Sequence, residues 1–371
     1  MLQKLRTPTQ VRIKGLPAGF EIGAIVRPET GDVLSFDQLL ADLETARIVY
    51  VGETHTNETH HYVQLKILKA LFERWGDTSV GMEMFEASYQ DVLDQWSRDL
   101  LDEASLLEGV DWENTWTFDF SLYRPILDFI RMESLTVVGL NVPGAIVDKV
   151  AREGLDSLSE EERGRIAREI DTSHERHRAY VKEVFERHES DDLKEFNFFY
   201  EAQCVWDDSM AQTIAEALNN NRVVVLAGNG HIAYKFGIPD RAYGRTRASF
   251  RTVMPVAVGT EVESDVADYI WVTHRQMPRP RRPVVGIRLE AMDNGKGVLI
   301  KGVIEKSPAA LAGIKAQDIL LAVDGRPITS LMDVHKAMAG AKRAPTHVFR
   351  IERQGETLEL TIRLKKRTQH D

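Results

Sequence analysis

Arg47-Ile-Val-Tyr-Val-Gly-Glu-Thr-His55 is the stretch that decides the fold of the larger part of this 371-residue chain. Its apolar run stops abruptly at Gly52, which is typical of a buried parallel strand whose carboxyl end opens into a loop. Directly afterwards, Asn57 or Thr59 can cap a helix whose apolar residues recur at helical spacing as far as Leu71. A strand followed at once by a helix is the repeating unit of an α/β fold.

The same alternation continues along the chain. Short apolar strands are predicted at 79–84, 135–140, 222–226, 250–257 and 269–272, and helices at 88–96, 123–133, 145–153 and 206–219. This order predicts an α/β fold with a mostly parallel sheet flanked by helices, and such sheets bind ligands at the carboxyl ends of their strands. We therefore assign residues 1–274 to one α/β domain.

A helical insertion interrupts this rhythm at about 159–201, where Glu, Arg, His and Asp are dense and apolar residues are few. It is either a solvated helical pair or a lid over the edge of the sheet. Within it, His174-Glu-Arg-His177 places two histidines one helical turn apart, a spacing that can hold a metal. Without a third ligand in view, the pattern favours a solvated helix face.

The overall composition limits the function. The formal net charge is −10 and the pI is about 5.7, which argues against nucleic acid as a partner, because phosphate binding needs a concentrated basic face. Prolines interrupt the basic run from Arg275 to Arg282, so we assign residues 275–283 to a linker. Cys204 is the single cysteine, which rules out intrachain disulfides. No segment approaches the ~18 apolar residues of a membrane span, and no export signal is visible.

A small C-terminal β-rich domain is predicted at 284–366, and its most specific stretch is Ser307-Pro-Ala-Ala-Leu-Ala-Gly-Ile-Lys-Ala-Gln-Asp-Ile-Leu-Leu-Ala-Val-Asp-Gly325. This stretch resembles the PDZ domains of bacterial envelope proteins, except that Gln317 stands where family members usually have Gly. The resemblance implies that the C-terminus of a protein partner or peptide pairs with an exposed strand edge. Its carboxylate would meet the backbone of Val285, Gly286 and Ile287. A module that only packs against its neighbour is the alternative.

Two Gly-x-x-His turns each follow an apolar strand directly and end at His55 and His231. Because the carboxyl ends of parallel strands meet at one edge of a sheet, we expect both histidines to project at the same rim. Acid and imidazole groups at one rim can share a proton, bind a metal or activate water. The predicted catalytic residues are His55, Glu83, His231 and Glu53, and the predicted ligands of a divalent metal are His55, His231 and Glu83.

The same residues resemble the haem-binding and Tiki-like superfamily, in particular its ChaN-like haem-uptake branch. The resemblance covers most of the first domain and rests on several motifs in the right order: Tyr50-Val-Gly-Glu-Thr-His55 with His60 or His61 after it, Gly81-Met-Glu-Met-Phe-Glu86, Gly139-Leu-Asn-Val-Pro143, Ala202-Gln-Cys-Val-Trp-Asp-Asp208 and Leu226-Ala-Gly-Asn-Gly-His-Ile232. The superfamily contains haem-binding proteins, metal-dependent peptidases, and esterases that use His and Glu without a metal. The fold alone does not choose between these functions.

In a haem-binding protein, an axial Tyr or His holds the iron while apolar and aromatic residues cover the macrocycle. The candidate haem-binding residues are His55, His231, Tyr234, Tyr180 and Trp116. In a hydrolase, His55 would be the general base or a metal ligand, Glu83 its carboxylate partner, and His231 a second ligand or an electrophilic stabiliser. The resemblance favours a haem-binding protein of haem or iron uptake at the cell envelope or periplasm. A metal-dependent peptidase or a His/Glu esterase is the alternative.

Overall fold

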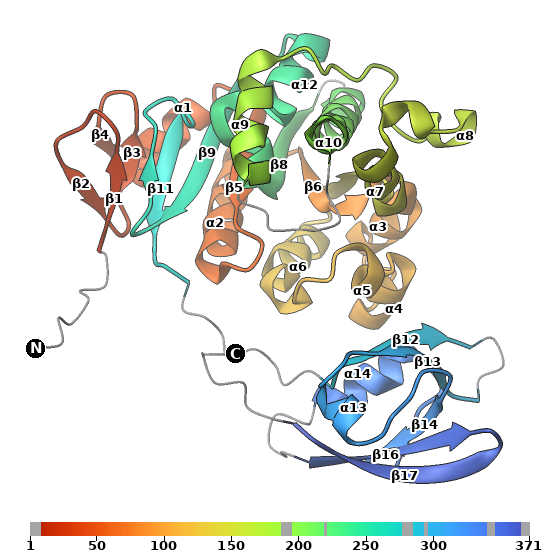
Figure 1. Cartoon of the computed structure of the whole chain (residues 1–371). Coiled ribbons are helices and arrows are strands. Elements are labelled where there is room, and N and C mark those ends of the chain that lie inside the picture. Colours follow the sequence, from red (N-terminus) through yellow and green to blue (C-terminus); the bar gives the residue numbers. More distant parts are fainter. Residues whose placement is uncertain are drawn as a thin grey trace, which may run out of the picture. The chain divides into compact units, whose positions relative to one another are not determined.

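The structure is a computed structural model that describes residues 9–186, 195–218, 221–276, 285–292, 296–339 and 346–364. The chain divides into two compact units, Met1–Gln276 and Met277–Asp371 (Figure 1). Residues 277–283 of the linker that we predict lie outside the described residues. In the described part of the chain, no helix is both long and apolar enough to cross a bilayer.

The first unit is built on an eight-stranded sheet in the order β4-β3-β11-β9-β5-β8-β6-β7. Its strands are β3 (Ile25–Arg27), β4 (Asp32–Leu34), β5 (Ile48–Glu53), β6 (Thr78–Glu86), β7 (Thr136–Asn141), β8 (Arg222–Gly228), β9 (Phe250–Ala257) and β11 (Tyr269–Thr273). The six strands from β11 to β7 pair in parallel, whereas β3 and β4 extend one edge antiparallel. The prediction of a mostly parallel sheet is confirmed.

Helices cover both faces of this sheet because its strands are buried on both sides. Val49 and Val51 of β5 belong to a core cluster with the helices α1 to α6, whereas Ile48 and Tyr50 belong to a cluster on the opposite face with α10 and α12. The covering helices are α1 (Phe36–Leu43), α2 (Glu58–Trp75), α3 (Gln90–Ser97), α4 (Glu103–Gly109), α5 (Trp112–Thr115) and α6 (Arg124–Met132) on one face, and α7 (Gly144–Glu153), α10 (Phe196–Leu218), α11 (Asn229–Ile232) and α12 (Ile238–Thr246) on the other (Figure 1).

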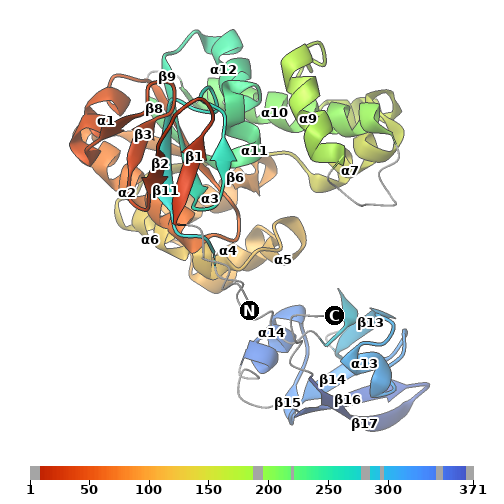
Figure 2. The same cartoon turned by 60° about the vertical axis from the view of Figure 1, so that its left-hand side comes forward.

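The chain also contains a three-stranded sheet that the sequence patterns did not reveal. It consists of β1 (Gln10–Ile13), β2 (Gly19–Glu21) and β10 (Glu261–Val262), with β1 between the other two. Val11 and Ile13 of β1 pack into a cluster with Val26 and Ile270 of the large sheet, so the small sheet covers one end of it (Figure 2). These strands are only two to four residues long, too short for an alternating pattern to be recognised.

The predicted helical insertion contains α8 (Glu160–Arg163) and α9 (Glu175–Glu186), and its residues 187–194 lie outside the described part. Its predicted end at 201 lies within α10, because this helix begins at Phe196 rather than near Trp206. The Tyr200 side chain is fully buried, and the Tyr200 hydroxyl donates to the carbonyl of His174 (3.2 Å). The first turn of α10 is therefore anchored to the loop that leads into α9.

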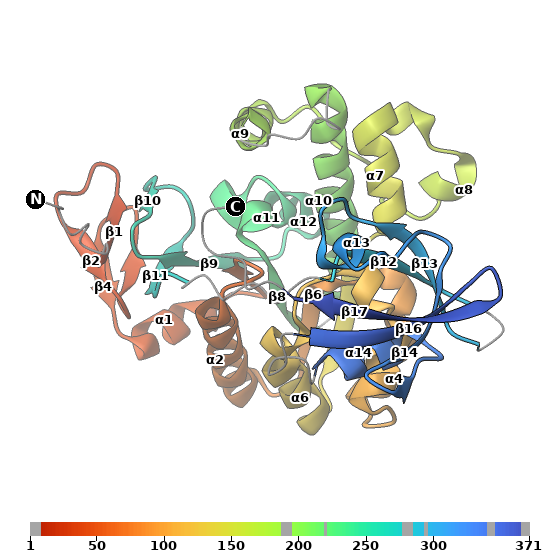
Figure 3. The same ribbon diagram turned by 60° about the horizontal axis from the view of Figure 1, so that its bottom comes forward.

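The described part of the second unit is rich in β-strands and contains the helices α13 and α14 (Figure 3). Its elements are β12 (Ile287–Ala291), β13 (Val298–Val303), α13 (Pro308–Leu311), β14 (Ile319–Val323), β15 (Arg326–Pro327), α14 (Leu331–Ala339), β16 (Thr346–Arg353) and β17 (Glu356–Arg363). The strand order is β12-β13-β14-β16-β17, with β15 paired to β14, so β12 is an edge strand. Its core contains Val298, Leu320 and Phe349.

Candidate functional site

Parallel pairing brings the two Gly-x-x-His turns together at one rim of the sheet. Glu53, the last residue of β5, stands in register with Gly228, the last residue of β8. Strand β6 pairs with the other edge of β8, with Met82 beside Leu226, so Glu83 follows at the same level. As the register requires, side chains from three adjacent strands converge where the strands end.

His55 is held from one side and open on the other. Its Nδ1 bonds the carboxyl group of Glu53, whose side chain is completely buried. The imidazole ring contacts Trp116 (4.9 Å between ring centroids) and Phe118 (4.8 Å), which also contact each other, and 31% of the side chain is exposed. Burial acts to lower the pKa of His55, but the bond to Glu53 and the nearby negative charges raise it. Among the described residues, none forms a hydrogen bond with Nε2.

Two buried side chains fix the backbone of the His55 turn. The Tyr123 hydroxyl donates to the carbonyl of His55 (3.3 Å), and Nε2 of His61 donates to the same oxygen (3.1 Å). His60 accepts a hydrogen bond from the backbone N–H of Thr54 (2.9 Å), which explains why two adjacent histidines follow the turn. Burial lowers the pKa of His60 to about 3, so His60 is a neutral structural residue.

His231 lies deeper, with 13% of its side chain exposed, and stands between two carboxylates. Its Nδ1 is 2.6 Å from Oδ1 of Asp207, and its Nε2 is 3.4 Å from Oε1 of Glu83. Burial acts to lower the pKa of His231, but Glu83 and Asp207 together raise it well above the usual value. The amide nitrogen of Gln203 donates to Oδ2 of Asp207 (3.2 Å) and lies 3.1 Å from Nδ1 of His231.

Glu83 is buried and holds the His231 turn. Its Oε2 accepts the backbone N–H of Gly228 (2.5 Å), and its carbonyl accepts the side-chain amide of Asn141 (3.0 Å). Burial acts to raise the pKa of Glu83, but the contact with His231, the charge on His55 and the hydrogen bond from Gly228 lower it to about 2. A Cβ on Gly228 would lie 2.9 Å from Cε1 of His55, so only glycine leaves room for the imidazole ring.

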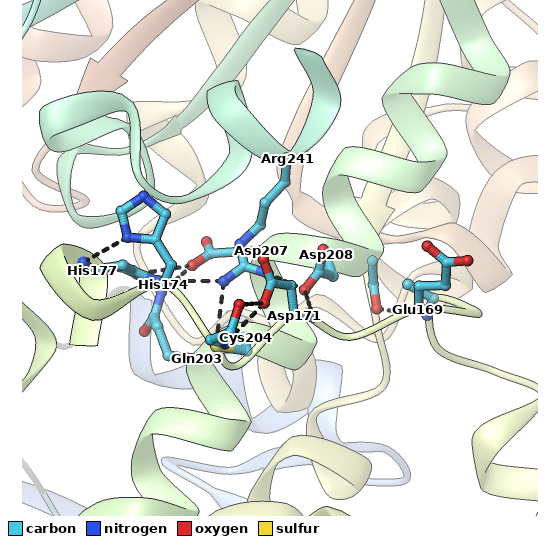
Figure 4. Close-up of polar contacts among 12 residues, drawn as sticks. Glu169, Asp171, His174, His177, Gln203, Cys204, Asp207, Asp208 and Arg241 are labelled. Carbon is cyan, nitrogen blue, oxygen red and sulfur yellow. Dashed lines mark hydrogen bonds and ion pairs between the residues drawn. The ribbon is translucent and has the colours of Figure 1, made fainter. Parts of the chain in front are cut away.

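A network of buried charges continues from Asp207 to His177, Asp208 and Arg241 (Figure 4). Nε2 of His177 lies 3.4 Å from Oδ2 of Asp207, and Arg241 bonds both Nδ1 of His177 (3.3 Å) and the carboxylate of Asp208. The expectation that His174 and His177 lie on a solvated helix face is wrong for His177, which is 1% exposed. The dense charges around His177 in the sequence predicted exposure. The side chain is buried because residues on α10 and α12 provide partners for its ring nitrogens.

The described residues contain no group of three or more His, Cys, Asp or Glu side chains arranged to hold a metal ion. The predicted metal ligands His55, Glu83 and His231 do meet at one rim, but His55 bonds Glu53 and His231 pairs with Glu83. A pocket of about 410 Å³ lies elsewhere in this unit, and its lining includes His174, Phe236 and Arg241.

Comparison with known proteins was made once this geometry was established. Residues 39–242, more than half of the chain, match the family model described as haem-binding uptake, Tiki superfamily, ChaN. The chain belongs to the ChaN family. Residues 283–364 match the PDZ domain model, so the second unit is a PDZ domain. Both resemblances inferred from the sequence are confirmed.

Individual proteins resemble parts of the chain. A ChaN structure from Campylobacter jejuni, described as showing cofacial haem binding, covers 67% of this chain and 95% of its own, with a TM-score of 0.55 and 19% identity. The chloroplastic protein RETICULATA-RELATED 5 of Arabidopsis thaliana is 25% identical over 260 residues, which are 62% of this chain and 34% of that protein. A probable periplasmic DegP-like serine endoprotease of Chlamydia trachomatis is 30% identical over 66 residues, which are 18% of this chain and 13% of that protein. The chain thus spans about a third or less of either curated relative.

The predicted haem-binding residues of this ChaN-family domain do not all lie on the same face of the large sheet. Trp116 packs in the cluster with Val253 of β9, whereas Tyr180 and Tyr234 pack against the cluster of Met254, the next residue along that strand. Adjacent strand residues point to opposite faces. Tyr180 and Tyr234 contact each other, with ring centroids 5.3 Å apart. The structure therefore groups Trp116 with His55 and places the tyrosines apart from them.

The predicted carboxylate-binding loop of the PDZ domain has the backbone geometry that its sequence requires. Gly286 has φ +84°, and a Cβ there would lie 2.2 Å from Cβ of Ser307. The carbonyl of Gly286 accepts the N–H of Ile304 (2.9 Å), and that of Val285 accepts the N–H of Ala309 (2.9 Å). Ile287 begins the edge strand β12.

Proposed function

We propose that the ChaN-family domain binds haem for haem or iron uptake, with His55 as the residue that would hold its iron, and that the PDZ domain binds the C-terminus of a protein partner. Family membership supports haem as the ligand. Bound haem would supply an iron that a nitrogen or oxygen atom of the protein can hold.

The observation that carries this proposal is the state of the His55 imidazole. A metal-ligating histidine usually has its second nitrogen bonded to a carboxylate or carbonyl group, which fixes the ring and increases its basicity. Nδ1 of His55 has such a partner in Glu53, and its Nε2 is left without a protein partner among the described residues. The flanking rings of Trp116 and Phe118 offer the apolar contacts that a macrocycle needs.

The other candidate ligands fit less well. An axial tyrosine binds iron as the phenolate, and burial with nearby carboxylates raises the pKa of Tyr234. Tyr200 is fully buried and its hydroxyl already donates to His174. His231 has carboxylates at both ring nitrogens. Among these side chains, His55 alone combines partial exposure with a ring nitrogen free of protein partners.

A haemin titration followed by visible absorbance tests the proposal, with His55→Ala compared with Tyr234→Phe and Tyr180→Phe. We expect a saturable shift of the haem band that His55→Ala abolishes or weakens strongly and that both phenylalanine variants retain. Loss of the shift in Tyr234→Phe together with its retention in His55→Ala would instead place the ligand among the tyrosines.

A second function, ester or amide hydrolysis without a metal, is favoured by the different surroundings of the two histidines at the rim. His55 offers a free ring nitrogen to a water molecule, while His231 lies between Glu83 and Asp207 and would stabilise developing negative charge. Turnover of p-nitrophenyl acetate that is lost in His55→Ala, with unchanged turnover after chelator treatment, would support it. No difference from the His55→Ala variant would exclude it.

For the PDZ domain, the edge position of β12 and the left-handed Gly286 support β-augmentation by a peptide C-terminus. Binding of a C-terminal peptide library, compared with the same peptides as C-terminal amides, tests this. Equal binding of acids and amides would contradict it. We also propose a cell-envelope location, which the similarity to a probable periplasmic protease supports and which cell fractionation would test.

A further inference from the structure

The pocket of about 410 Å³ in the first unit is lined by the segment that leads from α8 to α9 and by the helices α10 and α12. Its lining includes Glu169, Asp171 and His174 on that segment, Phe236 just before α12, and Asp240 and Arg241 on α12 (Figure 4). Small-molecule sites typically occupy ~300–1,000 Å³. Neither proposed binding site includes any of these residues, so the pocket is available for a different ligand.

The wall formed by residues 164–174 is irregular, but it is bonded to the helix behind it. The backbone N–H of Ala167 donates to Oγ of Ser209 (2.9 Å), a residue of α10. The backbone N–H of Asp171 donates to Oδ2 of Asp208 (2.8 Å) on the same helix. Because these bonds hold the segment in place, a ligand would enter a preformed pocket and would not have to order a loop on binding.

Three carboxylates in the lining have no cationic partner among the described residues. Glu169 and Asp240 form no ion pair there, and Asp171 accepts hydrogen bonds only from the neighbouring Ser173. Burial raises the pKa of Asp240, as expected for a partly buried carboxylate without a cation in contact. The pocket therefore has an excess of negative charge, which a ligand with positively charged groups would neutralise.

Arg241 adds one buried donor that lacks a partner. Its side chain belongs to a residue that is 8% exposed, and two of its three nitrogens are engaged. Nη1 bonds Asp208, whereas Nη2 bonds His177 and Cys204 (3.3 Å each). The Nε–H has no hydrogen-bond partner in the part of the chain that the structure describes. Because an unpaired buried donor is unfavourable, this N–H is a position for an oxygen atom of a ligand.

An aromatic wall accompanies these charged groups. Phe236 is buried, and its ring contacts His174 (5.0 Å between ring centroids) and stacks on Tyr234 (5.4 Å). Such a wall suits the methylene stem of a basic side chain, which lies along apolar surface while its charged end meets polar groups. The lining therefore matches a short molecule with a methylene stem, more than one positive charge and one oxygen acceptor.

We propose that this pocket binds a free basic amino acid. Its two cationic groups pair with the carboxylates of Glu169, Asp171 and Asp240, and its own carboxylate accepts the Nε–H of Arg241. A polyamine would leave the Arg241 donor unpaired, and an anion would meet three carboxylates that have no cation. The proposal goes beyond the proposed function of the strand-end site and does not depend on haem.

Isothermal titration calorimetry of the full chain tests the pocket with L-arginine and three analogues. L-Citrulline replaces the guanidinium group by a neutral urea, agmatine lacks the carboxylate, and Nα-acetyl-L-arginine, which represents an arginine at the C-terminus of a peptide, lacks the ammonium group. We expect saturable binding of L-arginine at millimolar concentrations. Each analogue should bind ~10–100-fold more weakly, as expected when one charge-assisted hydrogen bond is lost.

Matched variants locate the binding. Asp240→Asn should weaken L-arginine binding ~5–10-fold, because it removes one of the unpaired carboxylates. Asp148→Asn changes the net charge equally, but this exposed acid on α7 lies outside the lining, so the affinity should stay unchanged.

Four outcomes would overturn the proposal: no saturable heat with L-arginine, binding of L-citrulline or agmatine as tight as that of L-arginine, equal affinities of the two variants, or equally tight binding of Nα-acetyl-L-arginine, which would indicate a peptide end instead of a free amino acid. The comparison of analogues uses the wild type, so it holds even if a variant does not fold. Because the assay contains no haem, a failure of haem binding would be recognised separately.

Discussion

The two Gly-x-x-His turns have the same spacing and the same position after a parallel strand, yet their histidines have different environments. His55 takes its carboxylate partner from within its own turn and keeps one ring nitrogen open. His231 takes its partners from β6 and α10 and has a carboxylate at each nitrogen. The comparison teaches that the motif places the imidazole, whereas elements distant in the sequence determine what the imidazole can do.

The largest effect is expected from breaking the network that supports the His231 turn. Arg241→Met removes the buried cation that bonds Asp208 and His177 and leaves Asp208 with the partly exposed Arg245, so the free energy of unfolding should fall by ~3 kcal/mol, the low end for breaking a buried ion pair. Arg176→Met, which breaks an ion pair exposed on both sides, should cost less than ~1 kcal/mol. Urea denaturation measures the free energy of unfolding of both variants, and equal losses would contradict a stabilising role of the buried network.

Low pH should also destabilise the His231 turn. The pKa values of Glu83 and Asp207 are lowered in the folded protein, that of Glu83 to about 2. Depressed carboxyl pKa values stabilise the fold above the unfolded pKa, and this contribution is lost as pH falls through the folded pKa. Stability should therefore decline from about pH 4 towards pH 2, and Glu83→Gln should flatten that decline. Denaturation midpoints across this range provide the test, and an unchanged slope would count against it.

A single added methyl group should displace the His55 ring. Gly228→Ala places Cβ 2.9 Å from Cε1 of His55, so the ring must move and haemin affinity should fall ~10-fold, equivalent to ~1.4 kcal/mol. Gly230→Ala, two residues later, has no heavy atom within 4 Å of its Cβ and should bind haemin as the wild type does. The comparison of the two affinities separates displacement of the ring from a general effect of alanine.

A substitution in the PDZ domain should have the smallest effect on the two Gly-x-x-His turns. Gly286→Ala forces a Cβ into Ser307 at a backbone φ of +84°, so peptide binding by this domain should be lost. The haemin affinity of the ChaN-family domain should not change, because the two units have separate cores. Calorimetry of peptide binding and a haemin titration, both on the Gly286→Ala variant, test the two expectations. A changed haemin affinity would reveal coupling between the domains.

Sequence patterns were sufficient for the α/β fold and the PDZ domain because buried parallel strands appear as apolar runs and the PDZ stretch is highly specific. They also located the rim, since each run ends at a glycine before His55 or His231. They did not reveal the partnership of Asp207, His177 and Arg241, because three helices far apart in sequence must pack before these charges meet. Two signals were available, the pair in His174-Glu-Arg-His177 and the motif that ends at Trp206-Asp-Asp208, but neither pattern indicates which side chains meet.

The most direct test of the contrast between the turns is labelling with diethyl pyrocarbonate, which modifies accessible unprotonated imidazole, followed by peptide mass spectrometry with and without haemin. The account predicts that His55 is modified in the free protein and protected by haemin, while His231 remains unmodified in both samples. Modification of His231 at the rate of His55, or the absence of protection by haemin, would contradict it.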